Sequence, residues 1–220
     1  MTAFPNAQVR VERESGGVIA RAILSEYGAN ILVMAGTGCI AFARFRGKER
    51  VLGGWGYDIG DEGSGYYIGR KAVGYALREL DGEAGKELSL FTRTVFQESE
   101  PFISSSFEEF PKKRDSARGK LVRDRRGIAA LSKVVATCAR EGCPLSLRVL
   151  KENAEELGAL VSLASAGEEE EIRVVINGGV AVIADLWQDA FFAACPKVKR
   201  ENAVFTNEAI DKVLKKFLEE

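Results

Sequence analysis

Three glycine-rich runs lie close together in this chain and indicate its chemistry: GTGCI at residues 36–40, GGWG at 53–56 and GDEGSG at 60–65. Glycine has no Cβ and adopts positive φ angles without penalty, so backbone amides in such runs can come close to an oxyanion or a sugar ring. A single pair of glycines usually marks a tight turn between strands. Several glycine clusters in so short a stretch, joined by the carboxylates of Asp61 and Glu62, favour a ligand-binding surface.

The apolar pattern on either side of these clusters predicts an α/β domain. The expected helices cover residues 15–27, 64–80, 127–140, 145–166, 182–194 and 209–220, with helical character continuing through 81–96. The expected strands cover residues 31–35, 39–44, 50–52 and 172–176, with a short extended piece near Val198. Ser64 or Asp61 is available to cap the helix 64–80, and the acidic run 168–171 reads as an exposed loop. Strands, then helices, then a strand between helices indicate a mixed sheet with added helices.

Two long runs, GTGCIAFAR at residues 36–44 and GGWGYDIGDEGSGYYIGRKAV at 53–73, closely resemble one protein family. It is the N-acetylglucosamine kinase branch of the BadF/BadG/BcrA/BcrD-type ATPases, in the superfamily of acetate and sugar kinases, heat-shock chaperones and actin. Residues 123–161 and 174–180 extend the resemblance. It implies a ribonuclease H-like actin/sugar-kinase ATPase domain.

The resemblance also implies a domain assignment. Residues 1–220 correspond to the C-terminal, second domain of a two-domain enzyme, with a helical insert at about 64–166. Members of the family begin with a glycine-rich D-G-G-x-T-like motif that binds phosphate and metal. No such motif occurs in this sequence, so the first phosphate-binding domain is expected to be absent.

Site residues carry over from the family motifs position by position. The implied ligands are Gly36, Thr37 and Gly38 for phosphate, Gly54, Trp55, Gly56 and Asp61 for sugar, and Asn177, Gly178 and Gly179 for nucleotide, with no metal ligand. The local sequence supports the nucleotide assignment, because an apolar strand that ends in Asn-Gly-Gly just before a helix exposes backbone amides at the N-terminus of that helix. Trp55 could stack on a sugar or pack in a core, whereas Trp187 and Cys39 fit core positions better.

Glu14 is the candidate general base. Residues 9–15 lie where the family has a short strand ending in Asn-Asp, so Arg13 takes the place of the Asn and Glu14 that of the Asp. A Glu carboxylate can accept a hydroxyl proton, but it reaches one carbon–carbon bond further than Asp. The alternative is a Glu in the first turn of a helix, where it favours the helix dipole.

The amino-acid composition limits the kinds of partner that this protein is expected to bind. With 31 Lys and Arg against 32 Asp and Glu, the net charge of −1 offers no broad field for nucleic acid or an acidic membrane. The four cysteines form no C-x-x-C pair and histidine is missing, which argues against a zinc site, an iron–sulfur cluster and Ser-His or Cys-His catalysis. There is no apolar run of transmembrane length and no leader pattern, so we expect a cytoplasmic protein without membrane contact.

Three functions stay open. The first is an ATP-dependent kinase of N-acetylhexosamine-like sugars, using ATP and Mg²⁺, which needs the missing first domain from a partner chain or from a homodimer. The second is a non-catalytic regulatory domain that binds nucleotide or sugar. The third is an activator ATPase of the acyl-CoA dehydratase or reductase type, which residues 94–100 faintly resemble, although no cysteine stands beside them.

Overall fold

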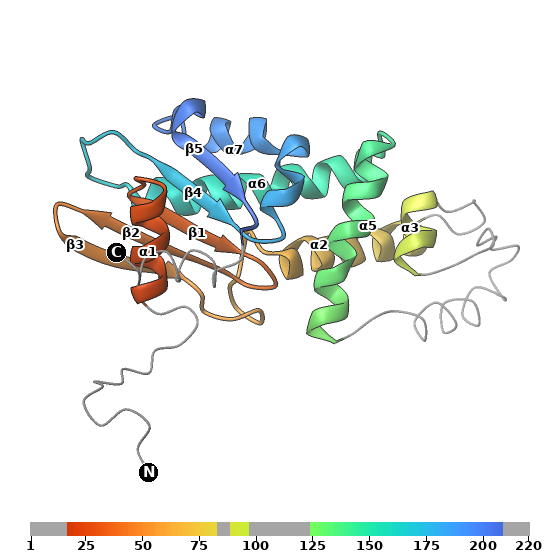
Figure 1. Ribbon diagram of the computed structural model, residues 1–220. Coiled ribbons are helices and arrows are strands. Elements are labelled where there is room, and N and C mark those ends of the chain that lie inside the picture. The colour runs from red at the N-terminus through yellow and green to blue at the C-terminus, as the bar shows by residue number, and fades with distance from the viewer. Residues whose placement is uncertain (1–16, 83–88, 97–123, 209–220) are drawn as a thin grey trace, which may run out of the picture.

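The computed structural model describes residues 17–82, 89–96 and 124–208 (Figure 1). A five-stranded mixed sheet in the order β3-β2-β1-β4-β5 forms its centre. The strands are β1 (Ile31–Ala35), β2 (Cys39–Phe45), β3 (Lys48–Gly53), β4 (Val174–Asn177) and β5 (Ala203–Thr206). β1, β2 and β3 form an antiparallel meander, whereas β4 runs parallel to β1 and β5 runs parallel to β4. The predicted α/β class with a mixed sheet is therefore confirmed.

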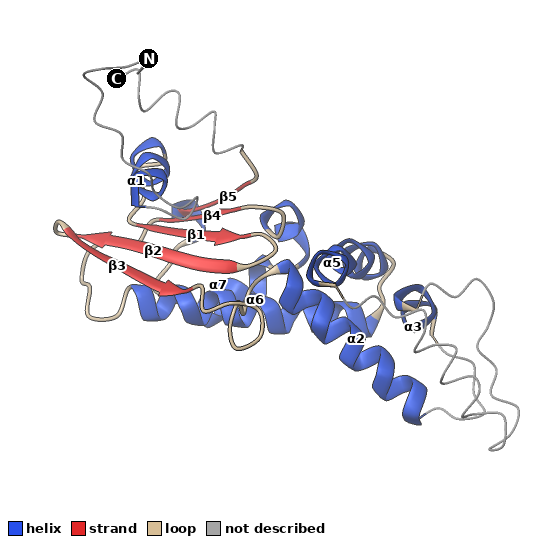
Figure 2. Ribbon diagram, turned by 90° about the horizontal axis from the view of Figure 1, so that it is seen from below, coloured by secondary structure: helices blue, strands red, loops and turns tan. Residues whose placement is uncertain are grey.

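Both faces of the sheet are covered by helices. Figure 2 shows α1 (Gly17–Glu26) on one side and α6 (Pro144–Ala164) with α7 (Gln188–Ala194) on the other. Successive side chains of β1 point to opposite faces, so Ile31 and Val33 join the larger core under α6 while Leu32 joins the smaller core under α1. Burial on both faces explains why β1 reads as an uninterrupted apolar run.

A helical extension projects from one end of the sheet (Figures 1 and 2). It contains α2 (Gly65–Gly82), α3 (Leu90–Val95) and α5 (Arg125–Arg140), and α2 packs along α5. Gly69 makes this close packing feasible, since a Cβ there would lie 1.8 Å from the Ile128 carbonyl oxygen. The N-terminal half of α6 joins α2 through Glu152, which accepts a hydrogen bond from the Tyr75 hydroxyl and pairs with Lys71 at 3.1 Å.

The segment predicted as one helix at 182–194 is instead broken. A 3₁₀ helix, η1 (Ala181–Leu186), ends at Trp187, where φ is −140°, and α7 starts after it. The break lets the Trp187 ring enter the core edge-on to Phe191 and Phe205, where its Nε1 donates to the Val180 carbonyl at 3.3 Å. The core position predicted for Trp187 is confirmed.

Other boundaries shift as well. The extended piece predicted near Val198 is wrong, because the Val198 amide closes a turn on the Cys195 carbonyl and the strand follows η2 (Arg200–Asn202) as β5. The strand predicted from residue 172 begins at Val174. Glu14 and the helix predicted for 209–220 lie outside the described residues.

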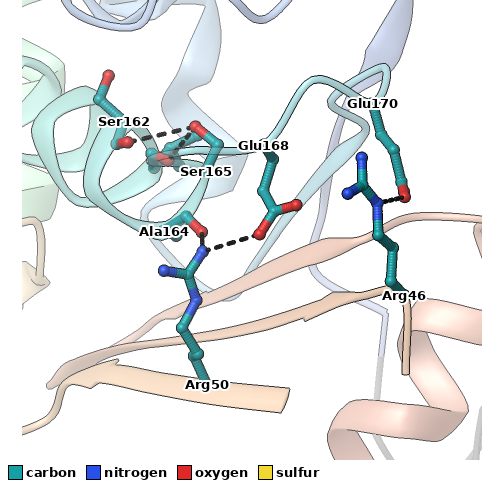
Figure 3. A network of polar contacts seen from close by, with 8 residues as sticks. Arg46, Arg50, Ser162, Ala164, Ser165, Glu168 and Glu170 are labelled. Atoms are coloured by element: carbon teal, nitrogen blue, oxygen red, sulfur yellow. Dashed lines mark hydrogen bonds and ion pairs between the residues drawn. The ribbon is translucent and has the colours of Figure 1, made fainter. Parts of the chain in front are cut away.

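The hairpin of β2 and β3 is tied to the loop after α6 (Figure 3). Arg50 donates to the Ala164 carbonyl at 2.6 Å and lies 3.6 Å from Glu168, while Arg46 donates to Glu170 at 2.9 Å. The acidic run predicted as an exposed loop is exposed except for half-buried Glu168. These contacts fix the outer edge of the sheet.

No helix of the described part is both long and apolar enough to cross a bilayer.

Candidate functional site

A cleft of about 730 Å³ opens at the carboxyl end of β1. In open α/β sheets, ligands commonly bind beyond the carboxyl ends of the strands. The cleft is lined by Met34, Gly36, Thr37, Gly38, Cys39, Ile40, Gly54, Gly56, Asp61 and Arg125. The structure therefore brings six of the predicted phosphate and sugar ligands together, although they come from two separate segments of the chain.

The turn between β1 and β2 forms one wall. The Gly36 amide donates to the Gly38 carbonyl at 2.9 Å, and the Gly36 carbonyl accepts from the amide of Gly65 at 2.7 Å. The first residue of α2 is thus bound to the turn. Thr37 is exposed at the tip. The turn presents small residues and a hydroxyl toward the cleft.

Asp61 forms the adjoining wall, and its backbone is unusual. Its φ of 61° is in the left-handed region, which non-glycine residues rarely adopt, although the residue is only 5% exposed. Two contacts hold this loop: the Asp61 carbonyl accepts from the Ser64 amide at 3.2 Å, and the Ser64 hydroxyl caps α2 by accepting from the Tyr67 amide at 3.1 Å. A Cβ on Gly38 would lie 2.8 Å from Asp61 Oδ2, so the carboxylate lies directly against the turn.

Arg125 is the charged residue of the cleft that was not predicted from the sequence. Its Nη2 lies 3.4 Å from Asp61 Oδ2, and its guanidinium lies 5.0 Å from the centre of the Tyr57 ring. It begins α5, which Asp124 caps by accepting from the Gly127 amide at 2.8 Å. In the sequence it belongs to a basic run that reads as solvated residues at a helix start. Only the packing of α5 on α2 brings it to the cleft.

The predicted nucleotide turn lies beside the cleft and does not line it. Gly178 has a φ of 125°, and a Cβ there would be 2.6 Å from the Ala35 carbonyl oxygen. Its amide donates to the Thr206 carbonyl at 2.9 Å, and Asn177 donates through Nδ2 to the Glu208 carbonyl at 3.3 Å. The turns after β1 and β4 are thus in direct contact. Gly179 is exposed, and a Cβ built on it would have no atom within 4 Å.

Trp55 and Ile59 are 78% and 80% exposed at the outer surface of the loop 53–64, and neither lines the cleft. Cys39 lies beneath the same loop and is 3% exposed. Burial, reinforced by the nearby charges of Asp61 and Glu62, raises the pKa of the Cys39 thiol, so it stays protonated. The core position predicted for Cys39 is confirmed. In the described ranges, no group of three or more His, Cys, Asp or Glu side chains is arranged to hold a metal ion.

Kinases of amino sugars are among the proteins of known sequence that are similar to this chain. The N-acetylmuramic acid/N-acetylglucosamine kinase of Clostridium acetobutylicum is 32% identical over 158 residues, which are 68% of this chain and 47% of that protein. The glucosamine kinase GspK of Vibrio cholerae is 26% identical over 190 residues, 84% of this chain and 58% of that protein. The chain thus spans about half the length of these curated relatives.

Solved structures share the fold. A candidate N-acetylglucosamine kinase from Chromobacterium violaceum superimposes with a TM-score of 0.61 at 24% identity, covering 90% of this chain and 63% of that one. A second, from Porphyromonas gingivalis, gives a TM-score of 0.58 at 18% identity, covering 91% of this chain and 63% of that one. The sugar-kinase type of fold expected from the sequence is confirmed. The model of the BadF/BadG/BcrA/BcrD ATPase family matches residues 2–191, and the chain therefore belongs to that family.

Proposed function

We propose that the cleft binds a hexosamine-like sugar next to the terminal phosphate of ATP, and that this chain takes part in transferring the phosphoryl group to a sugar hydroxyl. One observation carries the proposal. The glycine turn at residues 36–38 and the buried carboxylate of Asp61 face the same cleft, and only the missing side chain of Gly38 lets them approach so closely. A phosphate site and a hydroxyl acceptor side by side are what phosphoryl transfer to a sugar requires.

Each wall has a chemical role in this proposal. The turn offers backbone amides and the Thr37 hydroxyl to phosphate oxygens, where charge develops during transfer. Asp61 accepts a hydrogen bond from a sugar hydroxyl, and Gly54 and Gly56 leave room for the ring. Trp55 would cover the apolar face of the sugar if the exposed loop folded inward.

The nucleotide is proposed to lie across the two neighbouring turns. The contact of Gly178 with the end of β1 supports a continuous surface from Gly36 to Asn177 and Gly179. Family membership implies ATP, and Mg²⁺ would enter with its phosphates.

The remaining parts of the reaction are proposed from the resemblance. Glu14 would accept the proton of the sugar hydroxyl. The chain spans about half of its curated relatives, so the first phosphate motif would be supplied from outside these 220 residues, as by a partner chain that carries it.

Calorimetric titration with Mg-ATP, ADP and N-acetylglucosamine, combined with a coupled assay of ADP release, tests the function. Sugar-dependent ADP release is the expected result, either for the chain alone or after the complementary half is added. Binding of sugar and nucleotide that never leads to turnover would favour a regulatory domain. If neither ligand bound at millimolar concentration, the proposal would fail.

A further inference from the structure

Arg125 gives the cleft a positive charge that none of the ligands predicted from the sequence supplies. The cleft is otherwise lined by small or apolar residues, and Asp61 and Arg125 are its two charged side chains. The Arg125 side chain is 45% exposed, whereas that of Asp61 is 5% exposed. One charge is therefore fixed in the wall, and the other can reach an incoming ligand.

Most hydrogen-bonding capacity of this guanidinium is unused by the part of the chain that the structure describes. It has five N–H groups. Within residues 17–82, 89–96 and 124–208, its one polar contact is that to Asp61, at 3.4 Å. Charge-assisted N–H···O bonds are usually about 2.7–2.9 Å long, so this contact is weak. The guanidinium carbon also lies over the Tyr57 ring, 5.0 Å from its centre, in a cation–π contact that supplies no hydrogen-bond acceptor oxygen.

The position of the guanidinium indicates which ligand it meets. A Cβ on Gly38 would lie 3.1 Å from Arg125 Nη2 and 2.8 Å from Asp61 Oδ2. Arg125 thus lies over the turn that we propose for phosphate and beside the carboxylate that we propose for the sugar hydroxyl. The group that passes between these two places during the reaction is the phosphoryl group.

We infer that Arg125 binds an oxygen of the phosphoryl group being transferred, an inference that rests on the proposed function. In the step, the bond from phosphorus to the ADP oxygen breaks as the bond to the sugar oxygen forms, and the hydroxyl proton passes to a carboxylate. Arg125 stays protonated throughout. A guanidinium matches phosphate oxygens in geometry and charge, and it stabilises the charge that the transition state spreads over them.

The full chain tests this with four probes and three variants. The probes are glucosamine, glucosamine 6-phosphate, inorganic pyrophosphate and N-acetylmuramic acid, which carries a carboxylate. Arg125→Met keeps the aliphatic stem, Arg125→Lys keeps the charge, and Arg126→Met removes the same charge from the neighbouring exposed position as the matched control. Calorimetry gives the affinities, and circular dichroism with thermal unfolding shows that each variant folds.

Arg125→Met is expected to weaken binding of glucosamine 6-phosphate and pyrophosphate about tenfold or more, the size of one hydrogen bond to a charged group. Glucosamine should bind as before, and Arg126→Met should change neither affinity. Arg125→Lys should fall between wild type and Arg125→Met, and it supplies the comparison if Arg125→Met does not fold.

Four outcomes would overturn the inference. The first is an equal loss in Arg125→Met and Arg126→Met. The second is an equal loss for glucosamine, which would make Arg125 a residue that positions Asp61. The third is a loss confined to N-acetylmuramic acid, and the fourth is no binding of either phosphate probe to the wild type. If the wild type binds pyrophosphate in an Arg125-dependent way but binds no sugar, the phosphate contact of Arg125 stands, whereas its role in transfer to a sugar fails together with the sugar-kinase proposal.

Discussion

Replacing Gly69 by alanine should separate the two helices that frame the extension. A Cβ at this position would lie 1.8 Å from the Ile128 carbonyl oxygen and 2.7 Å from its carbonyl carbon. Both atoms belong to the backbone of α5, so no side-chain rotation relieves the contact. On the same helix, Gly74 has nothing within 4 Å of its Cβ position. Gly69→Ala and Gly74→Ala therefore add the same methyl group to the same helix, but only at Gly69 does this methyl group clash with a neighbouring helix.

The magnitudes follow from these contacts. For an ordinary contact of 3.4 Å, the Ile128 carbonyl must move by roughly 1.6 Å, a large shift for a close-packed interface. Overpacking of this kind costs about 1–3 kcal/mol and sometimes more, while alanine gains up to about 1 kcal/mol over glycine in a helix. We expect Gly69→Ala to lose about 2 kcal/mol of unfolding free energy and Gly74→Ala to gain about 0.5–1 kcal/mol.

Urea unfolding followed by far-UV circular dichroism measures this difference. Gly69→Ala should unfold at a lower urea concentration than wild type, and Gly74→Ala at the same or a higher one. Arg125 stands three residues before Ile128, so Gly69→Ala should also weaken pyrophosphate binding. Equal unfolding midpoints for the two variants would refute the reasoning, because they would mean that α5 does not pack on α2 at Gly69.

Three further predictions concern the stability of the fold and the sugar site. Burial raises the pKa of the Glu152 carboxyl, but the hydrogen bonds that it accepts, first that from Tyr75, lower this pKa by more. The ionised carboxylate therefore stabilises the fold at neutral pH, and this stabilisation is lost as the pH falls below the ordinary value of 4.5. Glu152→Gln should therefore cost about 1–2 kcal/mol at pH 7 and progressively less as the pH falls below 4.5, as measured by urea unfolding at pH 7 and in acid. Phe191→Ala empties a fully buried site and should cost about 3–5 kcal/mol, lowering the thermal midpoint by about 10 °C; an unchanged midpoint would contradict the core assignment. Gly38→Ala places a methyl group 2.8 Å from Asp61 Oδ2. Calorimetry should show about tenfold weaker sugar binding, while the free energy of unfolding should stay within about 1 kcal/mol of wild type. Unchanged sugar affinity would show that Asp61 is not part of the sugar site.

The sequence predicts what depends on local pattern. The apolar run of β1 and the glycine turn after it are visible because each is decided within a few residues. The Ser64 cap and the break between α5 and α6, where Gly142 precedes Pro144, the first residue of α6, follow from the same kind of local signal. These features account for most of the sheet and for one wall of the cleft.

Features that depend on tertiary packing could not be read in this way. The break at Trp187 arises because its ring fills a space between Phe191 and Phe205, and helical periodicity does not encode that space. Arg125 reaches Asp61 across 64 residues of sequence, through the crossing of α5 on α2 at Gly69. A charged side chain next to a helix start looks solvated until that crossing is known.

The hydrogen bond between the Gly36 carbonyl and the Gly65 amide fixes the N-terminus of α2 at the cleft. At 1.5 Å per residue, the helix carries its far end at Gly82 roughly 27 Å from that anchor. A tilt of about 5° would move the far end by roughly 2 Å, while the anchored end would move by only a fraction of an ångström. A sequence change at Gly82 therefore acts at the far end of α2, where a small tilt of the helix leaves the cleft wall formed by Gly36 in place.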